Sequence, residues 1–168
     1  ENYPAADALP KDPLMIESVV PRTGVNPITG DALVPAGQNN AINGNEWTIP
    51  KHDDLQYACI FPLVKVDQAT GNITPDTRDC SVPGKYAGCD CEDKTNDNPL
   101  CQPAAAGNTD QTKAKAYPGL RELQVLRDVG GQGIVGSVCP AQLNKPTDTD
   151  FGYRPAIGSI IDRLKQAL

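Results

Sequence analysis

The chain has 168 residues, which is enough for one domain with a buried core, and 39% of them are hydrophobic. Its net charge is −6, and its 15 Lys and Arg residues are scattered, so it lacks the clustered basic footprint of a nucleic-acid-binding protein. With 16 Pro and 15 Gly residues, and no apolar run near the roughly 18 residues that span a bilayer, we predict a small core within long, turn-rich loops.

Residues 1–50 are predicted to be mostly loop, because prolines interrupt almost every possible element. The exception is the apolar segment 14–20, whose composition is compatible with a strand or with one helical turn. Trp47, the single tryptophan, is expected to anchor a loop onto the core rather than to serve a ligand.

Residues 55–66 carry aromatic and β-branched side chains that favour a strand. Pro62 cannot donate a backbone hydrogen bond, so it places this strand at a sheet edge or breaks it in two. Residues 67–71 (DQATG) have turn composition and are predicted to close a small hairpin against residues 72–74.

Residues 76–113 hold four of the six cysteines and almost no large apolar side chains. Such a segment cannot order itself by packing, so covalent links or a bound ion must hold it. The even number of cysteines indicates disulfides and an oxidising, extracytoplasmic compartment. Zinc is the alternative, but Cys89 and Cys91 are separated by one residue rather than by about two to four, and His52 is distant in sequence. The six candidate disulfide residues are Cys59, Cys80, Cys89, Cys91, Cys101 and Cys139.

The pairing of these cysteines is only partly constrained by sequence. We predict one local bridge within residues 89–101. Cys59 and Cys139 both lie in apolar segments, so one of them is expected to tie the cysteine-rich loop to the core.

An acidic loop beside these cysteines is the best candidate ion site. Calcium takes several hard oxygen ligands from loops. The spacing is not that of an EF-hand, since the central Gly and the terminal Glu are missing, and a solvated polar loop is the alternative. The candidate calcium ligands are Asp90, Glu92, Asp93, Asn96 and Asp97.

His52 lies beside Asp53 and Asp54, as a general base would. The chain has no second histidine and no Gly-x-Ser-x-Gly turn, so a surface histidine is the favoured interpretation. We therefore predict no catalytic residue and no bound organic cofactor.

Residues 116–168 have the clearest periodicity. Apolar residues from Leu120 to Val129 repeat every three positions and predict an amphipathic helix that ends at Gly130 and Gly131. Residues 134–139 (IVGSVC) are apolar on both faces, as is typical of a strand within a parallel sheet. A second amphipathic helix follows from about Pro155, and its predicted stripe is Ile157, Ile160, Ile161, Leu164 and Leu168.

A strand that is apolar on both faces needs neighbouring strands. Residues 1–115 offer only one or two, so we interpret them as a loop-rich, disulfide-stapled insertion and residues 116–168 as the helix–strand–helix end of an incomplete α/β domain. Either the sheet is small and mixed, or its remaining strands lie upstream of Glu1 or in another chain, which is the interpretation that we favour.

The motif P-G-L-R-E-L at 118–123, followed by the Gly-rich turn and Ser137-Val138-Cys139, resembles the end of von Willebrand factor A-like domains in secreted or lipid-anchored proteins of proteobacteria, including myxobacteria. Residues 54–63, RDCS at 78–81 and CDCEDKTNDNPLC at 89–101 resemble the cysteine-rich insertion of that group. The resemblance implies an open, Rossmann-like α/β fold. It also implies a D-x-S-x-S metal-dependent adhesion motif, which this chain lacks.

From these features we expect an extracytoplasmic binding or adhesion-type protein that mediates protein–protein or surface interactions. Its partner would be another protein or the upstream part of the same polypeptide. One alternative is a non-catalytic accessory subunit that wraps a larger extracytoplasmic complex. The other is a fragment of a secreted hydrolase whose catalytic residues lie elsewhere.

Overall fold

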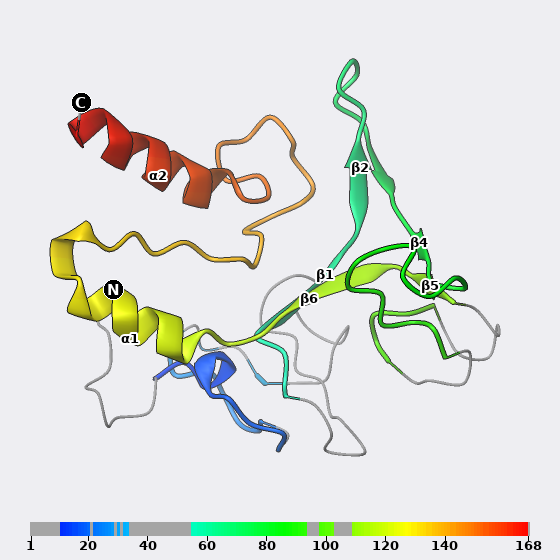
Figure 1. The fold of residues 1–168 in the computed structure, drawn as a ribbon, viewed down its shortest axis with the longest axis horizontal. Coiled ribbons are helices and arrows are strands. Elements are labelled where there is room, and N and C mark those ends of the chain that lie inside the picture. The colour runs from blue at the N-terminus through cyan, green and yellow to red at the C-terminus, as the bar shows by residue number, and fades with distance from the viewer. Residues whose placement is uncertain are drawn as a thin grey trace.

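The structure, a computed structural model, describes residues 11–20, 22–28, 30, 32–33, 55–93, 98–102 and 109–167. The elements in chain order are η1 (Pro13–Met15), β1 (Cys59–Pro62), β2 (Val64–Val66), β3 (Ile73–Pro75), β4 (Arg78–Asp79), β5 (Asp110–Gln111), β6 (Lys113–Ala116), α1 (Leu120–Asp128), η3 (Gly130–Gln132) and α2 (Arg154–Ala167) (Figure 1). Trp47 and His52 lie outside the described residues.

The predicted mixture of α and β structure is confirmed, but every described sheet is a two-stranded antiparallel pair. The predicted hairpin is formed by β2 and β3, which pair in antiparallel register from Val64 opposite Pro75 to Val66 opposite Ile73. As Pro62 predicted, the apolar run 55–66 is broken into two strands, β1 and β2. The segment 14–20 supplies only the single turn η1 and no strand.

Strand β6, with the sequence Lys-Ala-Lys-Ala, lies in a region predicted to be loop. It pairs antiparallel with β1, from Cys59 opposite Ala116 to Pro62 opposite Lys113. Short side chains at alternate positions let one face of this ribbon pack closely, and Ala116 is buried. The predicted boundary between residues 115 and 116 therefore falls inside a strand.

Two clusters of buried side chains make the core, and both are built on β1. Cys59 and Phe61 pack with Ala116 and Leu143, while Ile60 packs with Tyr57 and Leu100 on the other face. Because successive residues of a strand point to opposite faces, one short strand serves both clusters. Leu143 brings the C-terminal part of the chain onto the same core as the cysteine-rich part.

Three disulfides join all six cysteines: Cys59–Cys139, Cys80–Cys89 and Cys91–Cys101. The local bridge predicted within residues 89–101 is Cys91–Cys101. The expectation that Cys59 or Cys139 ties the cysteine-rich loop to the core is wrong, because these two residues pair with each other across 80 positions. That bridge fastens the segment after α1 to the β1–β6 ribbon.

Helices α1 and α2 occupy the ranges that periodicity predicted. α1 ends in the turn η3, where Gly130 has φ +60°, a left-handed conformation that glycine adopts without steric cost. Residues 134–139, in contrast, form no strand in the described structure, so the prediction of a parallel strand there is wrong. The segment runs as an unpaired trace between α1 and α2 (Figure 1), and no described strand lies beside it to complete a sheet.

Candidate functional site

The C-terminal region combines a fixed backbone with an exposed apolar surface. The segment after α1 passes closely beside both helices. A Cβ atom at Gly133 would lie 2.6 Å from the Leu126 carbonyl oxygen of α1, and one at Gly136 would lie 2.8 Å from the Cβ of Ala156 in α2. Only glycine allows these two approaches, so the segment is held between the helices.

Three further contacts fix α2. The Arg163 guanidinium donates a hydrogen bond of 2.6 Å to the Gly131 carbonyl oxygen, which ties α2 to the turn after α1. The Arg154 guanidinium donates one of 2.7 Å to the Asp148 carbonyl oxygen before the helix. The Tyr153 ring meets the Phe61 ring edge to face, with centroids 6.5 Å apart. These contacts tie α2 to the turn after α1, to the loop before the helix and to β1, and both arginines lie at exposed positions.

The predicted apolar stripe of α2 is exposed, although a helix on a globular domain normally buries such a stripe. The exposed fractions are 53% for Ile157, 43% for Ile160, 46% for Ile161 and 58% for Leu164. We call these four residues the α2 apolar face. Burying an Ile or Leu side chain completely is worth about 1.5–3 kcal/mol, so a partner that covers these half-exposed residues gains on the order of 3–6 kcal/mol.

Further apolar side chains are exposed on α1 and on the segment between the helices. Val125 is 63% exposed, Val129 51% and Val138 60%. Single exposed apolar residues on separate elements are ordinary, so these three are not counted with the α2 apolar face. Sequence periodicity predicted the α2 stripe, and the structure shows that its four residues from Ile157 to Leu164 are 43–58% exposed.

Lys115 of β6 is held by an ion pair and by two aromatic rings. Its ammonium lies 3.1 Å from the Asp90 carboxylate and about 5 Å from two ring centroids, at 5.3 Å from Tyr57 and 5.0 Å from Tyr117. Burial by itself lowers the pKa of Lys115, but interactions with the Tyr117 hydroxyl and with Asp90 outweigh it and raise that pKa above its usual value of 10.5. The cluster joins the cysteine-rich loop to the β1–β6 ribbon.

Replacing Lys115 by Met should lower the free energy of unfolding by about 1–2 kcal/mol at neutral pH, because it removes a half-buried ion pair and two cation–π contacts. Because the folded-state pKa of Lys115 is raised, its contribution is complete below pH 10.5 and is lost as the pH rises through the higher folded value. Urea unfolding measures the difference. Lys65→Met is the control, since Lys65 pairs with Asp76 on an exposed surface and should leave the midpoint unchanged. Equal midpoints for the two variants would refute this role.

The acidic loop does not assemble a calcium site from the described residues. Asp90 is engaged with Lys115, whereas Glu92 and Asp93 are exposed. Asn96 and Asp97 lie outside the described ranges. Across those ranges, no group of three or more His, Cys, Asp or Glu side chains is close enough to hold a metal ion. Calcium binding by this loop stays a prediction.

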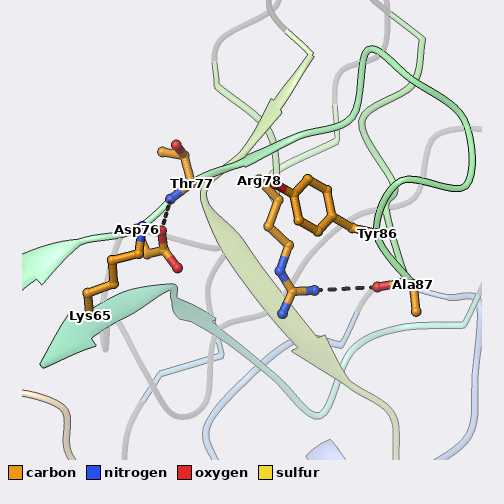
Figure 2. Close-up of a pocket in the computed structure, with 6 residues that line it drawn as sticks. All are labelled: Lys65, Asp76, Thr77, Arg78, Tyr86 and Ala87. Atoms are coloured by element: carbon orange, nitrogen blue, oxygen red, sulfur yellow. Dashed lines mark hydrogen bonds and ion pairs between the residues drawn. The ribbon is translucent and has the colours of Figure 1, made fainter.

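An open depression lies between the β2–β3 hairpin and the loop closed by Cys80–Cys89 (Figure 2). Its charged groups are already satisfied: the Lys65 ammonium lies 2.8 Å from the Asp76 carboxylate, which lowers the pKa of Asp76, and the Arg78 guanidinium donates to the Ala87 carbonyl oxygen. Tyr86 adds an exposed ring at the rim. The side chains that line this depression are mainly polar and charged.

Comparison with known proteins gives no match, whether the chain is set against family models, curated proteins or solved structures. Among the helices of the described ranges, none has the length and apolarity to cross a membrane.

Proposed function

We propose that this protein is a non-catalytic, extracytoplasmic binding protein, and that it binds a protein partner through the α2 apolar face. The observation that carries the proposal is the exposure of all four residues of that face, which are 43–58% exposed. A helix that presents an apolar stripe to solvent gains free energy when a partner covers the stripe.

The compartment follows from the cysteines. Three disulfides with no free thiol among six cysteines are typical of proteins that fold in an oxidising environment. The local bridges hold a loop that has little apolar surface, and they persist only where thiols are not kept reduced. These facts support an extracytoplasmic location.

We further propose that the C-terminal region is the end of a von Willebrand factor A-like domain, as the motifs at 118–123 and 137–139 imply. The order of α1, a glycine-rich turn, an apolar segment and α2 supports this interpretation. The D-x-S-x-S adhesion motif of such domains is absent from this sequence.

Site-specific photo-crosslinking in the organism that makes the protein tests the binding function. Ile160 is replaced by benzoylphenylalanine, the cells are irradiated, and adducts are identified by mass spectrometry. We expect a discrete adduct with a second polypeptide. The same label at Asp162, which is exposed on the polar side of α2, is the control and should give none. The absence of an adduct from position 160, or equal adducts from both positions, would contradict the proposal.

A further inference from the structure

Residues 134–138 present an unused set of backbone hydrogen-bonding groups. Among the described residues, none of their N–H or C=O groups makes a backbone hydrogen bond. Ile134 and Val135 are half-buried, whereas Gly136, Ser137 and Val138 are exposed. An extended segment with free donors and acceptors is a template on which another strand can pair.

The two helices determine what kind of strand fits. Gly133 lies against α1 and Gly136 against α2, and residues an odd number of positions apart in an extended chain point to opposite faces. The segment therefore has one helix on each face. A strand that pairs with this segment would also lie between the two helices. It must therefore be apolar on both faces, and it must be as short as the segment.

The α2 apolar face points neither at this segment nor directly away from it, but sideways past it. With about 3.6 residues per turn, the stripe is centred about a quarter turn away from Ala156, which is the residue that touches the segment. The side chains of the α2 apolar face would therefore cover a strand that is added beside residues 134–138. The occupant must supply a helix or an apolar surface there as well as the strand.

A second copy of this chain meets both requirements. Its residues Ile134-Val135-Gly136-Ser137-Val138 are apolar or small on both faces, and its own α2 carries the same exposed stripe. An antiparallel pair of identical strands has a twofold axis perpendicular to the ribbon, so the two copies of α2 would lie on the same face of it and meet through their apolar sides.

We propose that residues 134–138 and the α2 apolar face form the interface of a symmetric homodimer. The two segments pair as an antiparallel ribbon, and the α2 helices pack against each other over it. This inference rests on the proposed binding function and names the partner. The backbone pairing adds hydrogen bonds to the several kcal/mol available from the apolar face, which alone is small against the cost of association.

A membrane surface is the other class of occupant for an exposed amphipathic helix. The net charge of −6 opposes binding to anionic lipid, and α2 carries no Trp or Phe to lie at the interface. A lipid surface also leaves the backbone groups of residues 134–138 unpaired. A second copy is therefore the better fit.

Sedimentation equilibrium of the oxidised full chain over a wide concentration range tests the dimer. We expect a monomer–dimer equilibrium, with the dissociation constant raised about tenfold or more by Ile160→Gln and unchanged by Asp162→Asn, which lies on the polar side of α2. Hydrogen exchange of the wild-type protein is the second measurement: amides 134–138 should gain protection as the concentration rises, and those of the β2–β3 hairpin should not.

A wild-type chain that stays monomeric throughout overturns the homodimer, as does a dimer that both substitutions weaken equally. Binding to phosphatidylcholine–phosphatidylglycerol vesicles that Ile160→Gln abolishes would also overturn it and assign the face to a lipid surface. If the chain is monomeric but benzoylphenylalanine at position 160 gives an adduct with a different protein, the homodimer fails and the binding function stands. If position 160 gives no adduct at all, both the homodimer and the binding function are contradicted.

Discussion

Replacing both Cys59 and Cys139 by Ala should lower the free energy of unfolding by about 4.5 kcal/mol, the largest effect expected for any covalent link in this chain. The bridge closes a loop of 80 residues, so its removal restores a large conformational entropy to the unfolded chain. Cys59 is fully buried beside Phe61 and Ala116, so the variant also loses packing in the core. Urea unfolding under oxidising conditions measures the change.

The matched control is Cys91→Ala with Cys101→Ala, which opens a loop of only 10 residues. The same entropy relation gives about 2.7 kcal/mol for that loop. A deficit for the Cys59–Cys139 pair that does not exceed the deficit for the local pair would show that the long-range bridge does not hold the C-terminal region on the core.

Replacing Ile60 by Ala should cost about 2–5 kcal/mol of unfolding free energy. Ile60 is 1% exposed and lies between Tyr57 and Leu100, so truncation leaves a cavity under the β1–β6 ribbon. Thermal or urea unfolding reports the loss. Ile28→Ala makes the same chemical change at a side chain that is 63% exposed, and it should alter stability by no more than about 0.5 kcal/mol. Equal losses at the two positions would show that this cluster is not a core.

Much of the local structure could be predicted from the sequence. Periodicity located α1 and α2, turn residues located the β2–β3 hairpin, and Pro62 marked the break between β1 and β2. These features depend on residues that are close together in the chain. Strand β6 was missed because its Lys-Ala-Lys-Ala alternation is short, and its stability comes from pairing with β1, more than fifty residues earlier.

The features that sequence could not supply all depend on tertiary context. The pairing of Cys59 with Cys139 follows from the docking of the chain after α1 onto β1, which no local pattern reports. Helical periodicity shows that α2 has an apolar stripe, but it does not show what covers that stripe. In the same way, the apolar composition of residues 134–139 indicates a strand only if another strand is present to pair with it.

The structure shows where the missing strands would be needed. Residues 134–139 have the composition of a buried strand, but they pair with no described strand and lie between two helices. We propose that a protein partner covers this region. The two local disulfides close the cysteine-rich loops, and the Lys115 cluster joins those loops to the β1–β6 ribbon. Calcium binding by the acidic loop would be a separate property of the chain.

The most direct test of this interpretation is native mass spectrometry of the protein isolated, with its disulfides intact, from the organism that makes it. We predict a complex in which this chain is bound to at least one further polypeptide, with a second copy giving twice the monomer mass. A complex that dissociates when Ile160 is replaced by Gln, and not when Asp162 is replaced by Asn, would place the contact on the α2 apolar face. A single species at the monomer mass over the whole accessible concentration range would contradict the proposed binding function.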